Sequence, residues 1–235
     1  MAELYDVQNP WDPARYRSDA FYTDLVMAAG TVLDVGCGTG SMLHHARSAG
    51  HAGRLVGVDP DVPSLRRARA RADIEWVEGT AADLAWKGEF DLATMASNAF
   101  QCFVSDDDLR ASLTAIHAAL RDGGVFAFET RHPQAHAWED WNPSNASDVV
   151  SGGRTLRVWH EVESVMDGVV TFTETTGEQD GTVLHVGRTS LRFLDVPELN
   201  TFLEEAGFTI QAQYGDFQHG PLTPASRSIV TLARR

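Results

Sequence analysis

The sequence has few cysteines and no long apolar run, and its first residues do not follow the pattern of an export signal. Only Cys37 and Cys102 occur among 235 residues, which excludes a disulfide framework and fits a reducing cytosol. No apolar stretch approaches the roughly 20 residues that a membrane-spanning helix needs. The start of the chain carries acids, prolines and arginines where a secretory signal would have a basic stub and an apolar core. We therefore expect a soluble, cytoplasmic protein that does not act at a membrane.

Positive charge is also scarce. Lys and Arg number 19 against 33 Asp and Glu, so the formal net charge is −14. Such a charge repels phosphate backbones and anionic membrane surfaces. We expect no nucleic acid partner and favour a small neutral or cationic molecule instead. The length suits one domain, residues 1–235, and leaves monomer and homodimer both open.

The first half of the chain alternates between short apolar runs and helix-like stretches, with no internal repeat. The expected strands are residues 31–35, 54–58, 74–78, 90–95 and 125–129, and the expected helices are residues 39–49, 62–72 and 106–120. Parallel strands need crossover connections, which helices usually supply. The alternation therefore predicts an α/β fold with a mostly parallel sheet and helices on both faces.

Prolines, glycines and polar residues become frequent after residue 130. We expect a loop there, followed by three β-rich runs separated by Asp167–Gly168 and Asp180–Gly181. The Asp-Gly pair is the strongest short signal for a hairpin turn. Residues 131–194 are therefore predicted to form a loop and a three-stranded antiparallel insert.

The two ends of the chain complete this outline. Residues 1–30 are expected to form a helical cap before the first strand. Asp195 and Glu198 predict a capping box at the start of a late helix, and Gly207 predicts its end. The last two apolar runs have no helix between them and should pair antiparallel at an edge of the sheet.

The stretch "VLDVGCGTG", residues 32–40, places glycines 36, 38 and 40 between a strand and a helix. Bare backbone can approach a ligand closely at a helix N-terminus. A dinucleotide fingerprint would require a small residue at position 41, where Ser41 stands. Asp34 would also repel a pyrophosphate and favours a ligand with positive charge. S-adenosylmethionine carries an ammonium group and a sulfonium, and has no phosphate.

Two further acids follow neighbouring strands. Asp59 ends the second expected strand, 23 positions after Gly36, where a carboxylate can accept from both ribose hydroxyls. Asp83 follows the third strand and can accept from the exocyclic amine of adenine. A helix cap is the alternative role for Asp83.

The sequence resembles the class I S-adenosylmethionine-dependent methyltransferases. The resemblance rests on "VLDVGCGTG", "GVDPDVPSLRRARAR", "EGTAADL", "FDLATMASNAF" and "LRDGGVFAFE", in the order of the family. It covers about residues 15–130, and the closing helix and hairpin are similar too. It implies a Rossmann-like, seven-stranded sheet with an antiparallel final hairpin, and a cofactor across the carboxyl edge.

The resemblance also implies a set of S-adenosylmethionine-binding residues. Near the methionine moiety they are Asp34, Gly36, Cys37, Gly38 and Gly40; near the ribose, Asp59 and Pro60; near the adenine, Ala82 and Asp83; and near the methyl-donor end, Met95 and Ala96. His132 and His136 have the i, i+4 spacing that could hold a metal on a helix. Pro133 between them and the lack of an evident third ligand disfavour this, and we expect no metal.

The methyl acceptor is less defined by the sequence. Asn98, Phe100, Trp138 and Trp141 are candidate substrate contacts, because aromatic walls are common in small-molecule sites; the tryptophans could equally be packing residues. His132, just past the fifth strand, is a candidate general base, with an exposed loop histidine as the alternative.

The expected function is methyl transfer from S-adenosylmethionine to an O, N or C nucleophile of a small molecule. Two alternatives remain open at this point. The same pocket could bind S-adenosylmethionine or its demethylated product without turnover. An oxidoreductase with a nicotinamide cofactor is the other alternative, although Asp34 and Ser41 disfavour it.

Overall fold

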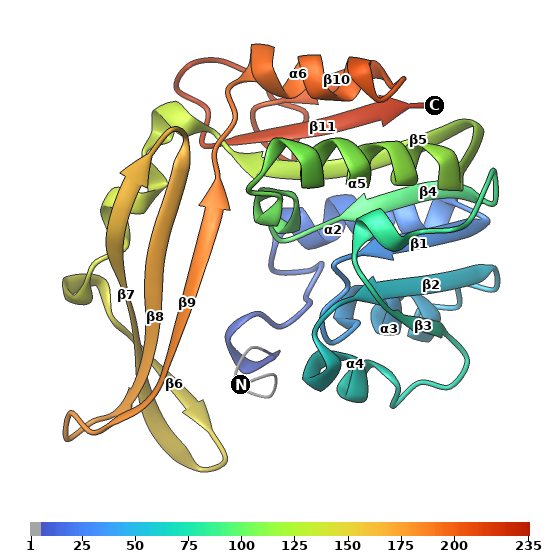
Figure 1. Cartoon of the computed structure of the whole chain (residues 1–235). Coiled ribbons are helices and arrows are strands. Elements are labelled where there is room, and N and C mark those ends of the chain that lie inside the picture. Colours follow the sequence, from blue (N-terminus) through green and yellow to red (C-terminus); the bar gives the residue numbers. More distant parts are fainter. Residues whose placement is uncertain (1–5) are drawn as a thin grey trace.

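The computed structural model describes residues 6–235, which form two β-sheets (Figure 1). The larger sheet has seven strands in the order β10-β11-β5-β4-β1-β2-β3. Its strands are β1 (Thr31–Val35), β2 (Arg54–Asp59), β3 (Glu75–Glu78), β4 (Phe90–Met95), β5 (Leu120–Arg131), β10 (Thr209–Tyr214) and β11 (Ser228–Arg234). The five strands from β5 to β3 in this order pair in parallel, and β11 pairs antiparallel with both β5 and β10. The predicted sheet and final hairpin are confirmed.

Helices cover both faces of this sheet. They are α2 (Arg17–Ala28), α3 (Ser41–Ser48), α4 (Val62–Ala68), α5 (Asp106–Ala119) and α6 (Val196–Glu205). Short 3-10 turns are η1 (Ala81–Asp83), η2 (Ala99–Cys102), η3 (Pro133–Ala135), η4 (Ala137–Asp140) and η5 (Pro143–Asn145). Figure 1 shows α5 in front of the sheet and α2 behind it. No helix within residues 6–235 combines the length and apolarity that a membrane span requires.

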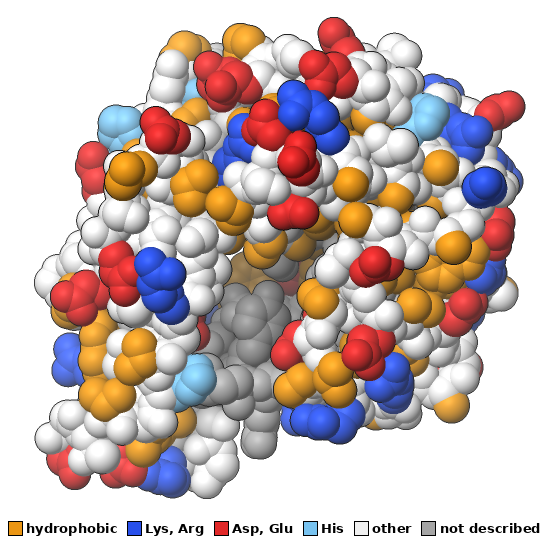
Figure 2. Space-filling view, in the orientation of Figure 1, with side chains coloured by type: hydrophobic (Ala, Val, Ile, Leu, Met, Phe, Trp, Pro, Cys, Tyr) orange, Lys and Arg blue, Asp and Glu red, His pale blue; other side chains and the backbone are white. Residues whose placement is uncertain are grey.

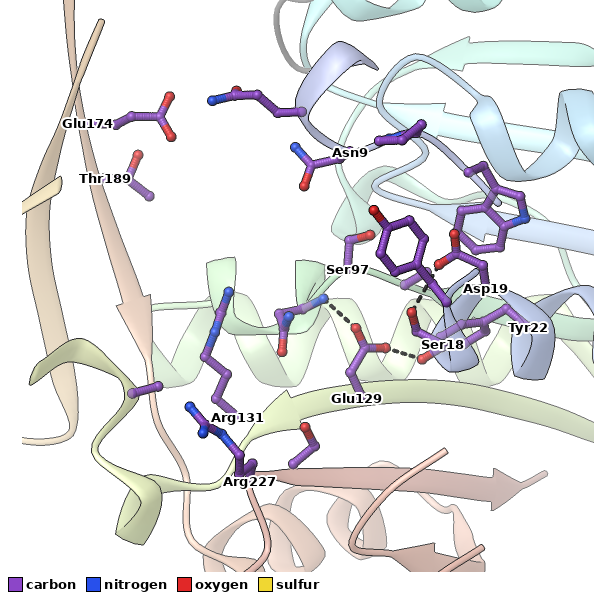
Figure 3. Close-up of a pocket in the computed structure, with 18 of the residues that line it drawn as sticks. Asn9, Ser18, Asp19, Tyr22, Ser97, Glu129, Arg131, Glu174, Thr189 and Arg227 are labelled. Atoms are coloured by element: carbon purple, nitrogen blue, oxygen red, sulfur yellow. Dashed lines mark hydrogen bonds between the residues drawn. The ribbon is translucent and has the colours of Figure 1, made fainter. Parts of the chain in front are cut away.

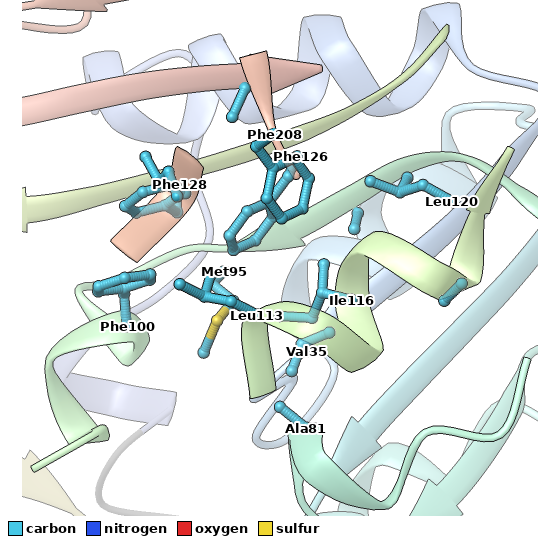
Figure 4. Close-up of a cluster of buried hydrophobic side chains, with 14 of the residues drawn as sticks. Val35, Ala81, Met95, Phe100, Leu113, Ile116, Leu120, Phe126, Phe128 and Phe208 are labelled. Carbon is cyan, nitrogen blue, oxygen red and sulfur yellow. The ribbon is translucent and has the colours of Figure 1, made fainter. Parts of the chain in front are cut away.

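Each face of the sheet has its own apolar core. Leu109, Leu113 and Ile116 of α5 follow the spacing of one helix face and pack on Phe126 and Phe128 of β5 (Figure 4). On the other face, side chains of α2 and α3 pack against β1 and β2, among them Tyr22, Val26, Leu43, Val32 and Leu55. Burial of each such side chain contributes about 1.5–3 kcal/mol, so the strand edge above these cores is rigidly supported.

The helix boundaries follow local capping. The Ser105 hydroxyl accepts from the Asp108 amide at 3.1 Å, which fixes the start of α5. Asp195 and Glu198 form the predicted capping box of α6, and Gly207 follows the helix with φ +93°. The helix α4 ends at Ala68, four residues earlier than predicted.

The insert has four strands where the sequence predicted three. They are β6 (Ser147–Ser151), β7 (Arg154–Met166), β8 (Val169–Glu178) and β9 (Val183–Arg192), in sequential antiparallel order. The expected loop contains β6, which pairs with β7 from Ser147 opposite Val158 to Ser151 opposite Arg154. The two Asp-Gly turns lie where predicted, between β7 and β8 and between β8 and β9.

The insert stands beside the carboxyl edge of the large sheet. The insert begins after β5 and ends before α6, and both of these connections lie at that edge (Figure 1). The space-filling view shows a hollow between the insert and the rest of the molecule (Figure 2). The predicted N-terminal cap lies partly outside the described residues; within them it is represented by α2 and the segment before it.

Candidate functional site

The glycine loop after β1 is fixed against β2. The amides of Gly36 and Cys37 donate to the carbonyl of Val58 at 2.8 and 3.1 Å. Gly36, Gly38 and Gly40 have φ of +74°, +53° and +79°, a region that favours glycine. A Cβ at position 40 would clash with the Trp76 ring, whereas a Cβ at Gly38 would meet nothing within 4 Å. The loop therefore presents open backbone at Gly38.

Asp59 joins the glycine loop to the end of β2. Its carboxylate accepts from the Gly38 amide at 2.7 Å and from the Asp61 amide at 2.8 Å. The side chain is buried, and desolvation raises its pKa although both amides lower it. Each carboxylate oxygen keeps a further lone pair for a ligand hydroxyl. Pro60, which follows, is exposed.

Asp34 lies under the loop in β1 and is almost fully buried. The Thr94 hydroxyl donates to its carboxylate at 2.9 Å. Burial, together with the charge of the nearby Asp59, raises the pKa of Asp34 to about 7, although the Thr94 hydrogen bond lowers it. A cationic ligand beside these two acids would favour their charged forms. The two carboxylates therefore fit a positively charged molecule with hydroxyls, such as S-adenosylmethionine.

Asp83 caps the short turn η1. Its carboxylate accepts from the Thr80 amide at 2.8 Å and the Thr80 hydroxyl at 2.7 Å. These hydrogen bonds lower the pKa of Asp83, so it stays ionised. The capping role weighed from the sequence is therefore present. Ala82 lies beside it and is exposed, so both remain predicted adenine contacts.

A second cluster anchors the N-terminal segment to the glycine loop. The Thr39 hydroxyl donates to Asp6, and the Arg67 guanidinium pairs with the same carboxylate at 2.8 Å. A cavity of about 360 Å³ lies beside these groups, with Ser41 and His44 also on its wall. Residues before the first strand thus contact the loop that follows it.

A cavity of about 900 Å³, here called the central cavity, lies between the sheet edge and the insert. Its inner end is formed by Ala96, Ser97 and Asn98, past the tip of β4, and by Glu129 of β5. Its other walls come from the segment before α2, from α2 itself, from β5, from the segment before β11 and from the insert. Their polar side chains include Asn9, Asp19, Tyr22, Arg131, Arg227, His160, Glu174, His185 and Thr189. Figure 3 shows Asp19, Tyr22, Arg131, Glu174, Thr189 and Arg227 of this set arranged around one space.

Glu129, like Ser97, is an inner-end residue that the sequence did not single out. Its side chain is only 3% exposed. One carboxylate oxygen accepts from the Asn98 amide at 2.7 Å, and the other accepts from the Tyr22 hydroxyl (Figure 3). Burial raises the pKa of Glu129 to about 7. The signal in the sequence was a lone acid at the carboxyl end of an apolar strand.

The predicted acceptor residues are placed in different surroundings. Asn98 lines the central cavity, but Phe100 is buried in the core and stacks on Phe128 with ring centroids 4.3 Å apart. Trp138 and Trp141 pack against Phe193, with their ring centroids 4.7 and 6.1 Å from the Phe193 ring centroid. These three aromatic side chains contribute to packing and do not line the central cavity.

Of the residues predicted at the methyl-donor end, Ala96 lines the central cavity and Met95 is buried in the core below it. His132 is 6% exposed, so it is not the exposed loop histidine considered as the alternative. Its Nδ1 accepts from the Gln134 amide at 3.2 Å, and it does not line the central cavity. The Nδ1 atom of His136 lies 3.3 Å from Oε1 of Glu139.

Comparisons with known proteins agree with this geometry. A family model described as a methyltransferase domain matches residues 32–124. The cypemycin N-terminal methyltransferase of a Streptomyces species is 26% identical over 208 residues, which span 87% of this chain and 83% of that protein.

Solved structures extend the similarity over the whole chain. The CcbJ methyltransferase from Streptomyces caelestis has a TM-score of 0.80 and 20% identity, covering 99% of this chain and 95% of its own. The sugar N-methyltransferase KedS8 from Streptoalloteichus sp has a TM-score of 0.72 and 17% identity, covering 100% and 93%.

The seven-stranded sheet, its final hairpin and the glycine loop at the carboxyl edge together define a Rossmann-like methyltransferase fold. The chain is an S-adenosylmethionine-dependent methyltransferase. The fold, the enzyme class and the cofactor expected from the glycine motif are confirmed.

Proposed function

We propose that this enzyme methylates a nucleophile of a polar small molecule that binds in the central cavity. The observation that carries this proposal is the position of the cavity: its inner end, Ala96 to Asn98, lies past β4, next to β1 and the glycine loop in the sheet order. A molecule in this cavity can bring a nucleophile to the edge where the methyl donor is expected.

The cofactor residues are proposed from the same edge. Asp34 and the glycine loop would face the methionine moiety, Asp59 would accept from the ribose hydroxyls, and Asp83 would accept from the adenine amine. Bound there, S-adenosylmethionine supplies a methyl group on a positively charged sulfur. The buried acids Asp34 and Asp59 favour that charge, and open backbone at Gly38 permits close approach.

The acceptor is proposed to be a polar molecule that carries an amine. Glu174 and Thr189 of the insert, Asp19 of α2 and Arg131 of β5 all line the cavity, which suits a molecule with several hydrogen-bonding groups. KedS8 is named as a sugar N-methyltransferase and the cypemycin enzyme as an N-terminal methyltransferase. Amino sugars and short peptides with a free amine are therefore the first compounds to test.

Holding the acceptor and methyl donor in line accounts for much of the rate. Well-oriented intramolecular reactions gain up to about 7–11 kcal/mol from proximity, and the rigid strand ends around the cavity are suited to this role. We further infer that the enzyme works in the cytoplasm as a monomer or homodimer. The net charge of −14 supports a small acceptor over a nucleic acid.

The test is release of S-adenosylhomocysteine from S-adenosylmethionine across a panel of amino sugars, short peptides, phenols and nucleosides. Turnover of an amino sugar or peptide supports the proposal. Tight cofactor binding with no product across the panel would contradict it.

Asp59→Asn tests the cofactor site by calorimetry with S-adenosylhomocysteine. We expect at least tenfold weaker binding, because hydrogen bonds to charged groups contribute about 1.5–3 kcal/mol. The matched control is Asp91→Asn, since Asp91 accepts from the Thr31 amide at 2.8 Å at the opposite edge of the sheet. An equal loss of S-adenosylhomocysteine affinity in Asp59→Asn and Asp91→Asn would argue against the proposed cofactor site.

A further inference from the structure

Glu129 occupies an unusual position for a carboxyl group. It follows Phe128, which pairs with Met95 of β4, so its side chain lies level with Ala96 at the inner end of the central cavity. The carboxylate is held on two sides, by the Asn98 amide at 2.7 Å and by the Tyr22 hydroxyl (Figure 3). Both donors are neutral groups, and both come from segments that line the same cavity.

Burial and the surrounding charges together set the proton affinity of Glu129. Burial is the largest influence and raises the pKa of the carboxyl group to about 7, while Arg131 on the same strand lowers it. The negative charge of Asp34 also acts on Tyr22, whose pKa it raises. Within residues 6–235, the other charged or titratable groups facing this space are Tyr16 before α2, Asp19 of α2, Arg227 before β11, and His160, Glu174 and His185 of the insert. A carboxyl group so placed exchanges its proton near neutral pH.

Tyr22 stays protonated in this arrangement. Its own burial and the charge of Glu129 raise the pKa of the phenol well above its usual range, so its hydroxyl remains a donor to the carboxylate. Ser97 and Asn98 have φ of +57° and +60°, a strained region for residues other than glycine. This backbone directs the Asn98 amide toward Glu129. Tyr22 and Asn98 are therefore positioning groups for one carboxylate.

We propose that Glu129 is the catalytic base, which takes the proton that the acceptor nucleophile gives up at the inner end of the central cavity. This inference rests on the proposed function, because it requires an acceptor in that cavity. Each carboxylate oxygen accepts one hydrogen bond from the protein and keeps a second lone pair for the proton.

The step balances for an amine acceptor. Glu129 removes one proton from the ammonium form and becomes neutral, which leaves a lone pair on the acceptor nitrogen. The nitrogen uses this pair to form its bond to the methyl carbon, while both electrons of the carbon–sulfur bond stay on sulfur. The methylated ammonium leaves with the positive charge, and Glu129 returns its proton to water. A hydroxyl acceptor would give its proton to Glu129 as the oxygen–carbon bond forms.

The first experiment measures Glu129 directly, without an acceptor. Protein labelled with carbon-13 at the glutamate carboxyls is titrated by NMR with S-adenosylhomocysteine present, and Glu129→Gln identifies the resonance by its absence. We expect a midpoint near pH 7. Tyr22→Phe should move this midpoint to higher pH, because the Tyr22 hydrogen bond lowers the pKa of Glu129. A midpoint near 4.5 in the wild type would overturn the assignment.

The second experiment uses the acceptor found in the panel. Glu129→Gln should lower kcat by at least about 100-fold, the lower range for a general base, with S-adenosylhomocysteine affinity and Tm close to wild type. In the wild type, kcat/KM should rise with pH through the midpoint measured by NMR, and Tyr22→Phe should shift this rise upward by the same amount. Glu129→Asp should restore part of the rate.

The outcomes separate this inference from the proposed function. Wild-type protein that releases no S-adenosylhomocysteine with any acceptor overturns the proposed function. Wild-type turnover combined with near-normal kcat and an unchanged pH profile in Glu129→Gln overturns the role of Glu129 alone. A lower Tm of Glu129→Gln with no change in its pH profile would mean that the carboxyl group serves stability, and this result also overturns the proposed role of Glu129 as a base.

Discussion

Gly38 provides the sharpest test of the glycine loop, because the structure supplies a matched control. Gly38 and Gly88 both have positive φ, +53° and +67°, and a Cβ at either position would meet nothing within 4 Å. Gly38 lies at the carboxyl edge of the sheet, whereas Gly88 precedes β4 at the opposite edge. Substitution by alanine therefore introduces similar backbone strain at two sites and added bulk at only one proposed ligand surface.

The expected magnitudes follow from this geometry. The left-handed conformation costs a residue with a Cβ about 1–2 kcal/mol. For a domain of this size each kcal/mol lowers Tm by about 2–4 °C, so Gly38→Ala and Gly88→Ala should each lose about 2–8 °C. A methyl group forced into a packed contact costs about 1–3 kcal/mol. Gly38→Ala should therefore bind S-adenosylhomocysteine about tenfold or more weakly, while Gly88→Ala binds normally.

Thermal unfolding and calorimetry on both variants decide the matter. Similar Tm losses with an affinity loss confined to Gly38→Ala support the proposed cofactor position. Unchanged affinity in Gly38→Ala would refute the reasoning, because the open backbone at Gly38 would then face solvent and not the ligand. Equal affinity losses in the two variants would assign the effect to general destabilisation.

Two further predictions concern buried titratable groups. The folded-state pKa of Glu129, about 7, lies above its ordinary value of 4.5, so the folded protein binds more protons between these values. The free energy of unfolding should fall as pH rises from 4.5 to 7, by about 3 kcal/mol from this group. Urea unfolding at pH 5 and pH 8 should show a smaller fall in Glu129→Gln, and an equal fall would contradict the assignment. Burial beside Asp34 and Asp59 raises the pKa of the Cys37 thiol far above its usual range. Burial also raises the pKa of the Cys102 thiol, but this residue is exposed, so iodoacetamide at pH 8 should alkylate Cys102 first, as peptide mass spectrometry can establish.

Local signals in the sequence predicted much of the fold. The strands at residues 31–35 and 90–95 have the predicted bounds, since each is an apolar run between polar or glycine-rich segments. The Asp167–Gly168 turn and the capping box at Asp195 were also predictable, because their residue types determine backbone geometry within a few positions. The same holds for the glycine loop.

Features that depend on distant residues were not predictable in this way. The strand β6 is short and pairs with β7, and the prolines and glycines around it indicated a loop. Phe100 looked available as a single aromatic residue after a strand, yet its ring fills space beside Phe128. Glu129 gains its significance from Tyr22, 107 positions earlier in the chain. None of these contacts leaves a periodic pattern in the sequence.

The insert has a consequence for how specificity can diversify. The central cavity takes its inner end from β4 and β5, whose other side chains form the two cores, but takes Glu174, His185 and Thr189 from a separate antiparallel sheet. Substitutions at these three positions alter the acceptor side of the cavity and leave the glycine loop and Asp59 intact. Under the proposed function, changes in β8 and β9 are therefore expected to shift acceptor preference while the loop that would hold the methyl donor keeps its sequence.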